Sequence, residues 1–132
     1  MFTPLRHALG LGLLTTAVLT AGTAQAEART LADAVYSKAQ AKVGRELYES
    51  HCATCHETDY FDGVFRAWSG ETVATLFDVM AGTMPQSNPG SLRDQEYLDV
   101  LAYILKENDF DAGDEALGSD AVPLDEVRIV HP

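Results

Sequence analysis

Apolar residues recur at helical spacing in three stretches of the chain, which predicts helices over residues 31–50, 71–81 and about 91–106. In the middle stretch the apolar residues fall at i, i+3, i+4 and i+7: Val73, Leu76, Phe77 and Met80. Ser91 and Asp94 have the spacing of an N-cap and N3 pair, so the third helix is expected to begin there. The chain has no internal repeat, and the pattern predicts an all-α fold with three main helices.

The pattern breaks down between these helices. Residues 57–70 hold aromatic side chains among Gly, Asp and Ser without a sustained period, so a loop is expected there. Residues 83–90 contain Pro85 and Pro89, which exclude a regular helix. From residue 107 the chain carries many acids and scattered apolar residues. Residues 107–132 are therefore expected to form an acidic strap laid over the domain.

The first 26 residues resemble a secretory signal peptide. A basic start precedes an apolar run at residues 9–21, and Ala24-Gln25-Ala26 has the small-x-small pattern of a cleavage site. The run of about thirteen residues falls short of the roughly 20 needed to cross a bilayer, although an uncleaved anchor is an alternative. We therefore expect a periplasmic protein with a mature domain of residues 27–132 and no membrane span after cleavage.

Acidic residues dominate the charge. The sequence has 9 Lys and Arg against 20 Asp and Glu, a formal net charge of −11. Cleavage after Ala26 would remove Arg6 and no acid, which leaves eight bases and a net charge of −12. Such a charge argues against a nucleic acid or an anionic membrane as partner. It favours redox protein partners with a basic docking face, or serves solubility alone.

The two cysteines and the histidine of Cys52-Ala53-Thr54-Cys55-His56 carry the candidate chemistry. Cys-x-x-Cys-His is the attachment motif of c-type haem. On a helical turn both sulfurs reach the vinyl groups along one porphyrin edge, and His56 projects to the iron. A zinc site would need about four ligands, and a redox dithiol would need an α/β context. We therefore predict one covalent haem c held by Cys52, Cys55 and His56.

The second axial ligand of the iron is predicted to be Met84. It lies in the proline-bounded segment, whereas Met80 falls on the apolar stripe of a helix, where methionine is usually core. His51 and His131 are the alternatives, of which one directly precedes the attachment turn and the other is the penultimate residue. A six-coordinate iron leaves no open position for a substrate, so electron transfer is expected rather than catalysis. Trp68 is a candidate wall residue that would hydrogen-bond a haem propionate.

These residues resemble those of class I cytochromes c over about residues 40–130. The shared features are the attachment motif, Met84-Pro85, and Gly44 with Tyr48 on the first helix. The resemblance implies a cytochrome c fold in which Gly44 lets the first and last helices cross closely. The chain departs from the family where Glu57 replaces a glycine and no proline occurs between His56 and Pro85. Another backbone carbonyl, in residues 58–64, must then orient His56.

A narrower resemblance links residues 68–105 to cytochrome modules that serve quinoprotein alcohol dehydrogenases. It implies that electrons come from a periplasmic dehydrogenase and pass towards a terminal oxidase or another cytochrome. The leading expectation is a periplasmic electron carrier and not an enzyme. The alternatives are an electron-transfer subunit of a larger dehydrogenase complex and a haem-based ligand carrier or sensor.

Overall fold

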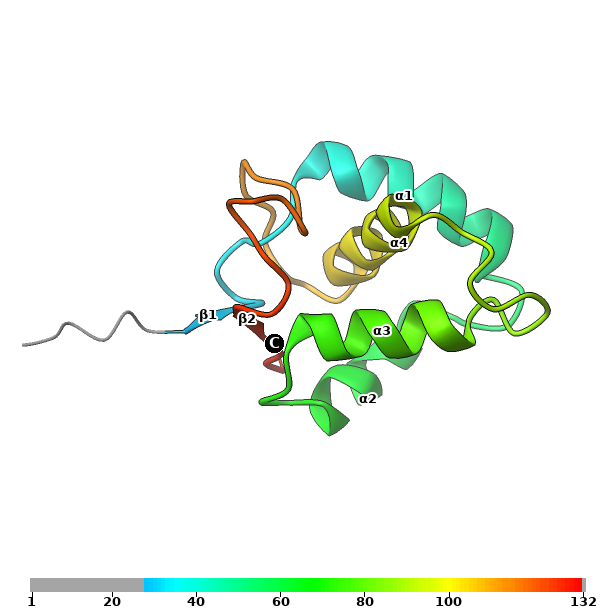
Figure 1. Cartoon of the computed structure of the whole chain (residues 1–132), viewed down its shortest axis with the longest axis horizontal. Helices are drawn as coiled ribbons and strands as arrows, with labels where there is room; N and C mark the ends of the chain where they lie inside the picture. The colour runs from blue at the N-terminus through cyan, green and yellow to red at the C-terminus, as the bar shows by residue number, and fades with distance from the viewer. Residues whose placement is uncertain (1–27, 132) are drawn as a thin grey trace, which may run out of the picture.

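A computed structural model describes residues 28–131 of the chain. Four helices follow one another: α1 (Lys38–His51), α2 (Tyr60–Ala67), α3 (Val73–Thr83) and α4 (Asp94–Glu107). The first and last cross each other, and α2 and α3 lie below this pair in the view of Figure 1. The predicted all-α fold is confirmed, with the addition of one short pair of parallel strands, β1 (Arg29–Thr30) and β2 (Val127–Arg128). No helix within residues 28–131 is long and apolar enough to span a membrane.

The crossing of α1 over α4 depends on Gly44. A Cβ atom at this position would lie 1.7 Å from the carbonyl oxygen of Asp99 and 3.0 Å from the backbone nitrogen of Val100. Only a residue without a side chain permits this approach. Four residues further along α1, the ring of Tyr48 packs against that of Tyr103 on α4, with 5.3 Å between their centroids. The predicted glycine crossing is therefore present.

The first helix begins seven residues later than the sequence predicted. Its N-cap is Ser37, whose hydroxyl accepts the backbone N–H of Gln40 at 3.1 Å. The preceding residues form turns, and the Asp33 carboxylate closes one of them by accepting the backbone N–H of Thr30 at 2.7 Å. Val35 is buried in this non-helical segment, whereas Val43 on α1 is 50% exposed. The apolar positions of this stretch therefore belong to two different structures.

The segment after the haem motif is not a plain loop: it adds a short helix to the three main helices that the sequence predicted. Residues Tyr60–Ala67 form α2, although Gly63 weakens the intrinsic helix preference of this stretch. Its Phe65 is 0% exposed and packs edge-to-face on Phe110, with ring centroids 5.3 Å apart. Burial of this ring in the tertiary structure stabilises α2, which is too short for its apolar pattern to predict a helix.

The starts of α3 and α4 also differ from the predictions. Thr72 caps α3 by accepting the backbone N–H of Thr75 at 3.2 Å. Arg93 is the N-cap of α4, and the Glu96 carboxylate accepts its backbone N–H at 2.8 Å. The capping pair of the third predicted helix is thus Arg93 with Glu96 rather than Ser91 with Asp94. An acidic residue three positions after the cap satisfies one of the otherwise unpaired N–H groups.

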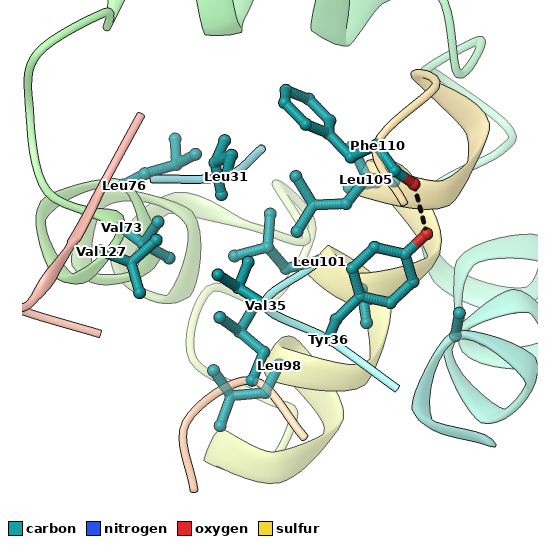
Figure 2. Packing of buried hydrophobic residues seen from close by; sticks show 14 of the residues in the cluster. Leu31, Val35, Tyr36, Val73, Leu76, Leu98, Leu101, Leu105, Phe110 and Val127 are labelled. Carbon is teal, nitrogen blue, oxygen red and sulfur yellow. Dashed lines mark hydrogen bonds between the residues drawn. The ribbon is translucent and has the colours of Figure 1, made fainter. Parts of the chain in front are cut away.

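The residues after α4 run back over the molecule and hold its first described residues. Gln40 on α1 makes two hydrogen bonds with the backbone of Leu117, at 3.1 Å and 2.8 Å. Farther on, β2 pairs with β1, so both ends of the described chain lie together. The apolar residues of this stretch are buried: Phe110, Leu117, Val122, Val127 and Ile129. Figure 2 shows two of them in a core shared with α3, α4 and residues 31–36.

Candidate functional site

The haem motif directly continues helix α1. Cys52 is the C-cap of α1, and its carbonyl accepts the backbone N–H groups of Cys55 at 3.1 Å and His56 at 3.0 Å. The motif therefore forms one further helical turn, as the spacing of its residues requires. Neither cysteine is in a disulfide; the Cys55 thiol is exposed, and Cys52 is half-buried. Burial raises the pKa of the Cys52 thiol, which keeps it protonated at neutral pH.

Cys52, Cys55 and His56 lie on one turn of the backbone. Within residues 28–131 no three His, Cys, Asp or Glu side chains are placed to hold one metal ion. Two thiols and an imidazole on one backbone turn are the groups that a haem bonds, each at a different atom. The cofactor's chemistry therefore matches the arrangement of the residues present.

Several apolar side chains of α1, α2 and α3 remain partly exposed although they pack on the core. They are Leu47 on α1, Phe61, Val64 and the C-cap Trp68 of α2, and Phe77 and Met80 on α3. The rings of His56 and Phe61 lie 5.9 Å apart, which brings α2 next to the motif. Half-covered apolar surface of this kind is what a flat, mostly apolar group would bury. The residues present therefore fit a haem.

A tyrosine on α1 holds the backbone of His56. The Tyr48 hydroxyl donates to the His56 carbonyl at 2.8 Å, and the ring is 3% exposed. Burial, with smaller contributions from nearby groups such as Cys52, raises the pKa of Tyr48 to about 12. The hydroxyl therefore stays protonated and remains a donor at neutral pH.

An asparagine at the end of α4 holds the next turn of the chain. The Asn108 side-chain amide donates to the Thr58 carbonyl at 3.0 Å and to the Ile104 carbonyl at 2.8 Å. Its side chain is buried, so these bonds are formed in a site of low water access. In a segment without proline, Tyr48 and Asn108 fix the backbone on both sides of Glu57. These bonds position the backbone at His56 and Thr58; within residues 28–131 no carbonyl of residues 58–64 accepts a hydrogen bond from the His56 imidazole, so that prediction stays a prediction.

Met84 is positioned in a similar way by the other helix of the crossing pair. It is the C-cap of α3, is partly buried, and precedes Pro85 through a cis peptide bond. Its carbonyl accepts the Tyr97 hydroxyl at 2.6 Å, and Tyr97 lies on α4. Met80, the alternative ligand, is one turn earlier on α3 and packs against the core. The helices that cross at Gly44 therefore hold the backbones of both His56 and Met84.

The remaining candidates lie in different places. Trp68 is the C-cap of α2 and is partly buried at the edge of the core. His51 is exposed at the end of α1. The ring of His131 instead contacts Asp62 on α2, with 2.7 Å between Nε2 and Oδ1. The His131 ring is thus engaged in a surface contact with α2.

The sequence did not single out Tyr97 or Asn108, and it assigned Tyr48 only to helix packing. A buried tyrosine hydroxyl must find a hydrogen-bond partner, so a tyrosine within an apolar helical stripe is a signal for such a contact. An asparagine directly after a helix is a similar signal. In neither case does the sequence indicate which carbonyl is bound.

The fold and the attachment turn define a c-type cytochrome. The chain belongs to the family described as cytochrome c oxidase, cbb3-type, subunit III, whose model matches residues 39–104, half of the sequence. No curated protein and no solved structure matches the chain. The family supports haem-based electron transfer, and proteins of this kind are generally electron-transfer proteins. The predicted signal peptide, residues 1–26, lies outside the described residues.

Proposed function

We propose that the protein is an exported, periplasmic one-electron carrier with a single haem c. Cys52 and Cys55 would bind the haem covalently, and His56 and Met84 would be the axial ligands of its iron. The observation that carries the proposal is the attachment turn, which continues α1 and is held by Tyr48 at the His56 carbonyl. When bound, the haem supplies the one-electron redox change; the chain's residues fix its position and limit water access.

The two tyrosines suit this role because they hold backbone atoms and leave side chains free. Tyr48 holds His56 through its carbonyl, and Tyr97 holds Met84 in the same way. An electron carrier needs ligands that stay in place when the iron changes its charge, since movement would slow the transfer. Methionine–histidine ligation also raises the potential above that of other axial pairs.

We further propose that electrons come from a periplasmic dehydrogenase of the quinoprotein class and pass towards a terminal oxidase or another cytochrome. The resemblance of residues 68–105 to dehydrogenase-linked cytochrome modules supports the donor. A second candidate is a subunit of a larger redox complex, and the family description, which names an oxidase subunit, favours it. Purification from native membranes and periplasm separates the two: a free carrier is monomeric, and a subunit remains with its complex.

Intact mass and an optical spectrum of the purified protein test the proposal. The expected mass is that of a chain beginning at Glu27 plus one haem. The reduced protein is expected to show a low-spin spectrum that carbon monoxide leaves unchanged. A protein without haem would refute the proposal. Rapid, tight binding of carbon monoxide would instead indicate a ligand carrier or sensor with an open iron position.

A further inference from the structure

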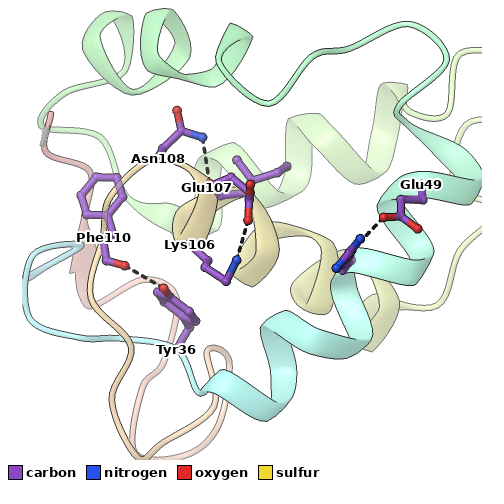
Figure 3. A network of polar contacts seen from close by, with 8 residues as sticks. Tyr36, Glu49, Lys106, Glu107, Asn108 and Phe110 are labelled. Carbon is purple, nitrogen blue, oxygen red and sulfur yellow. Dashed lines mark hydrogen bonds and ion pairs between the residues drawn. The ribbon is translucent and has the colours of Figure 1, made fainter.

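A pocket of about 440 Å³ lies between the first half of α1 and the end of α4, on residues that the haem motif does not use. The rings of Tyr36, Tyr103 and Phe110 are among its lining residues; those of Tyr36 and Phe110 are buried, and that of Tyr103 is partly exposed. Figure 3 shows Tyr36 and Phe110 beside Lys106, with the Tyr36 hydroxyl donating to the Phe110 carbonyl at 2.7 Å. This bond fixes one wall of the pocket, which is within the size range of ligand and anchor sites.

Positive charge gathers around this pocket. The sequence has nine Lys and Arg residues, of which Arg6 precedes the described part, and four of the other eight line the pocket. Three of these lie on one face of α1 at i, i+4 and i+7, and the fourth is on α4: Lys38, Lys42, Arg45 and Lys106. Such a concentration is unexpected in a chain whose acids outnumber its bases by eleven.

Nearby acids compensate only part of this charge. Arg45 pairs with Glu49 at 2.8 Å, and Lys106 pairs with Glu107 at 2.6 Å. Asp111 also lines the pocket. Lys38 and Lys42 form no ion pair with any residue in the described part of the chain, so both ammonium groups are free to meet an anion. We call this site, defined by Lys38, Lys42, Arg45, Lys106 and the three rings, the basic pocket.

The basic pocket is connected to the haem motif through two tyrosines. Tyr103 forms a wall of the pocket, and its ring centroid is 5.3 Å from that of Tyr48. The Tyr48 hydroxyl in turn donates to the His56 carbonyl at 2.8 Å. Packed rings and a hydrogen bond therefore form a continuous path from the surface to the residue proposed as an iron ligand. Such a path carries an electron better than an open gap of the same length.

We propose that the basic pocket docks a redox partner whose own docking face is acidic, and that an electron passes between them through Tyr103 and Tyr48. Tyr103, the one of the three rings that is partly exposed, supplies apolar contact at the centre of such an interface, above the buried Tyr36 and Phe110, and the lysines supply the charged rim. The acidic surface elsewhere repels the same partner and so orients its approach. The inference rests on the proposed function, because it requires a haem at His56. It gives a carrier of net negative charge a docking face rich in lysine and arginine.

Hexacyanoferrate(III), an anionic one-electron oxidant, tests this inference with the haem-loaded protein. In the reaction the reduced protein loses one electron, and the oxidant becomes hexacyanoferrate(II). The double variant Lys38→Gln/Lys42→Gln is expected to react about three- to tenfold more slowly at low ionic strength, because charges within a Debye length steer the anion. High salt is expected to remove the difference.

Arg66→Gln/Arg93→Gln is the matched control, since it changes the net charge equally on α2 and at the start of α4. This control variant is expected to slow the oxidation by hexacyanoferrate(III) much less than the lysine variant does. A cationic oxidant, tris(1,10-phenanthroline)cobalt(III), should show no slowing in either double variant. Reduction potentials and circular dichroism establish that the variants differ only at the surface.

Equal slowing by the two double variants would overturn the inference, because net charge alone would then explain the rates. A salt-sensitive dimer that the lysine substitutions abolish would also overturn it and would assign the pocket to a second copy of the chain. Failure of the proposed function gives a different result: a protein that lacks haem reacts with neither oxidant.

Discussion

At the scale of single residues, the two proposed iron ligands are held in the same way. Each lies just after a helix end, and each has its backbone carbonyl bound by a tyrosine hydroxyl from the crossing pair α1 and α4. The side chain that would bind the iron is separate from the atom that positions it. Changes to the ligand and changes to its support should therefore have distinguishable effects.

Met84→Ala is expected to lower the reduction potential and to let carbon monoxide bind the reduced protein. The reason is that the iron would lose a thioether ligand and gain an open position. Met80→Ala is the matched variant, because Met80 lies one turn earlier on α3 and packs on the core. It is expected to change stability and leave the carbon monoxide response unaltered. The opposite pattern would show that Met80 is the ligand.

Tyr48 is expected to make stability fall at alkaline pH. Burial raises its pKa in the folded protein to about 12, above the ordinary tyrosine value of 10.0. Between these values the unfolded chain loses the tyrosine proton before the folded one does, so the free energy of unfolding decreases as pH rises through this range. Below the unfolded pKa this contribution is fully present. Burial also raises the pKa values of Tyr36 and Tyr103, which add to the effect in the same direction.

Denaturant unfolding measured from about pH 9 to about pH 12 tests this, because that range brackets the ordinary tyrosine pKa near 10. In Tyr48→Phe the free energy of unfolding should decrease less steeply at alkaline pH. At neutral pH the variant should be less stable, because it lacks the hydrogen bond to the His56 carbonyl. An unchanged alkaline slope in Tyr48→Phe would show that its hydroxyl titrates alike in the folded and unfolded chain.

At the scale of elements, the structure depends on how closely two helices approach. Gly44 sets the distance between α1 and α4, and both tyrosines that hold the ligand residues project from these helices. A change in the crossing therefore moves both supports together. The haem motif follows α1 directly and would move with it.

Gly44→Ala is expected to destabilise the protein by about 3 kcal/mol or more, because the new methyl group must displace the backbone at Asp99. Gly63→Ala on α2 is the control: nothing lies within 4 Å of the added carbon, and alanine is the better helix former by about 0.5–1 kcal/mol. Thermal unfolding of the haem-loaded variants gives both values. A small destabilisation by Gly44→Ala would mean that α1 and α4 can move apart without a large loss of stability.

At the scale of the whole molecule, the segment after α4 closes the fold. It covers α1 through the bonds between Gln40 and Leu117 and brings β2 against β1. The segment is strongly acidic, yet it is held by its apolar residues, which are buried while most of its carboxylates are exposed.

Leu117→Ala is expected to lower the free energy of unfolding by about 2–5 kcal/mol, because the side chain is 1% exposed and its loss leaves a cavity. Replacing the exposed Asp120 and Asp125 with Asn should change it by no more than about 0.5 kcal/mol. Chemical denaturation of the three proteins compares the two effects. A larger loss from the aspartates would show that charge holds the segment.

Residues 60–67 show the limit of predicting helices from apolar periodicity in the sequence. Helical periodicity identified α3 and α4 because their apolar residues repeat over enough turns to be distinguished from a random pattern. It missed α2, which has eight residues, because its stability comes from burying Phe65 against Phe110 far along the chain. It also placed the start of the first helix too early, since the apolar residues before Ser37 are buried without being helical.

The sequence by itself determined the haem-attachment turn and the candidate iron ligands, because spacing along one helical turn is local information. Only the tertiary structure decided how these residues are held. Tyr48 meets His56, Asn108 meets Thr58 and Tyr97 meets Met84 because of the way the helices pack. The basic pocket has the same origin, since its lysines and rings are brought together from α1, α4 and the segments that flank them. Contacts between distant residues depend on packing, which no local pattern records.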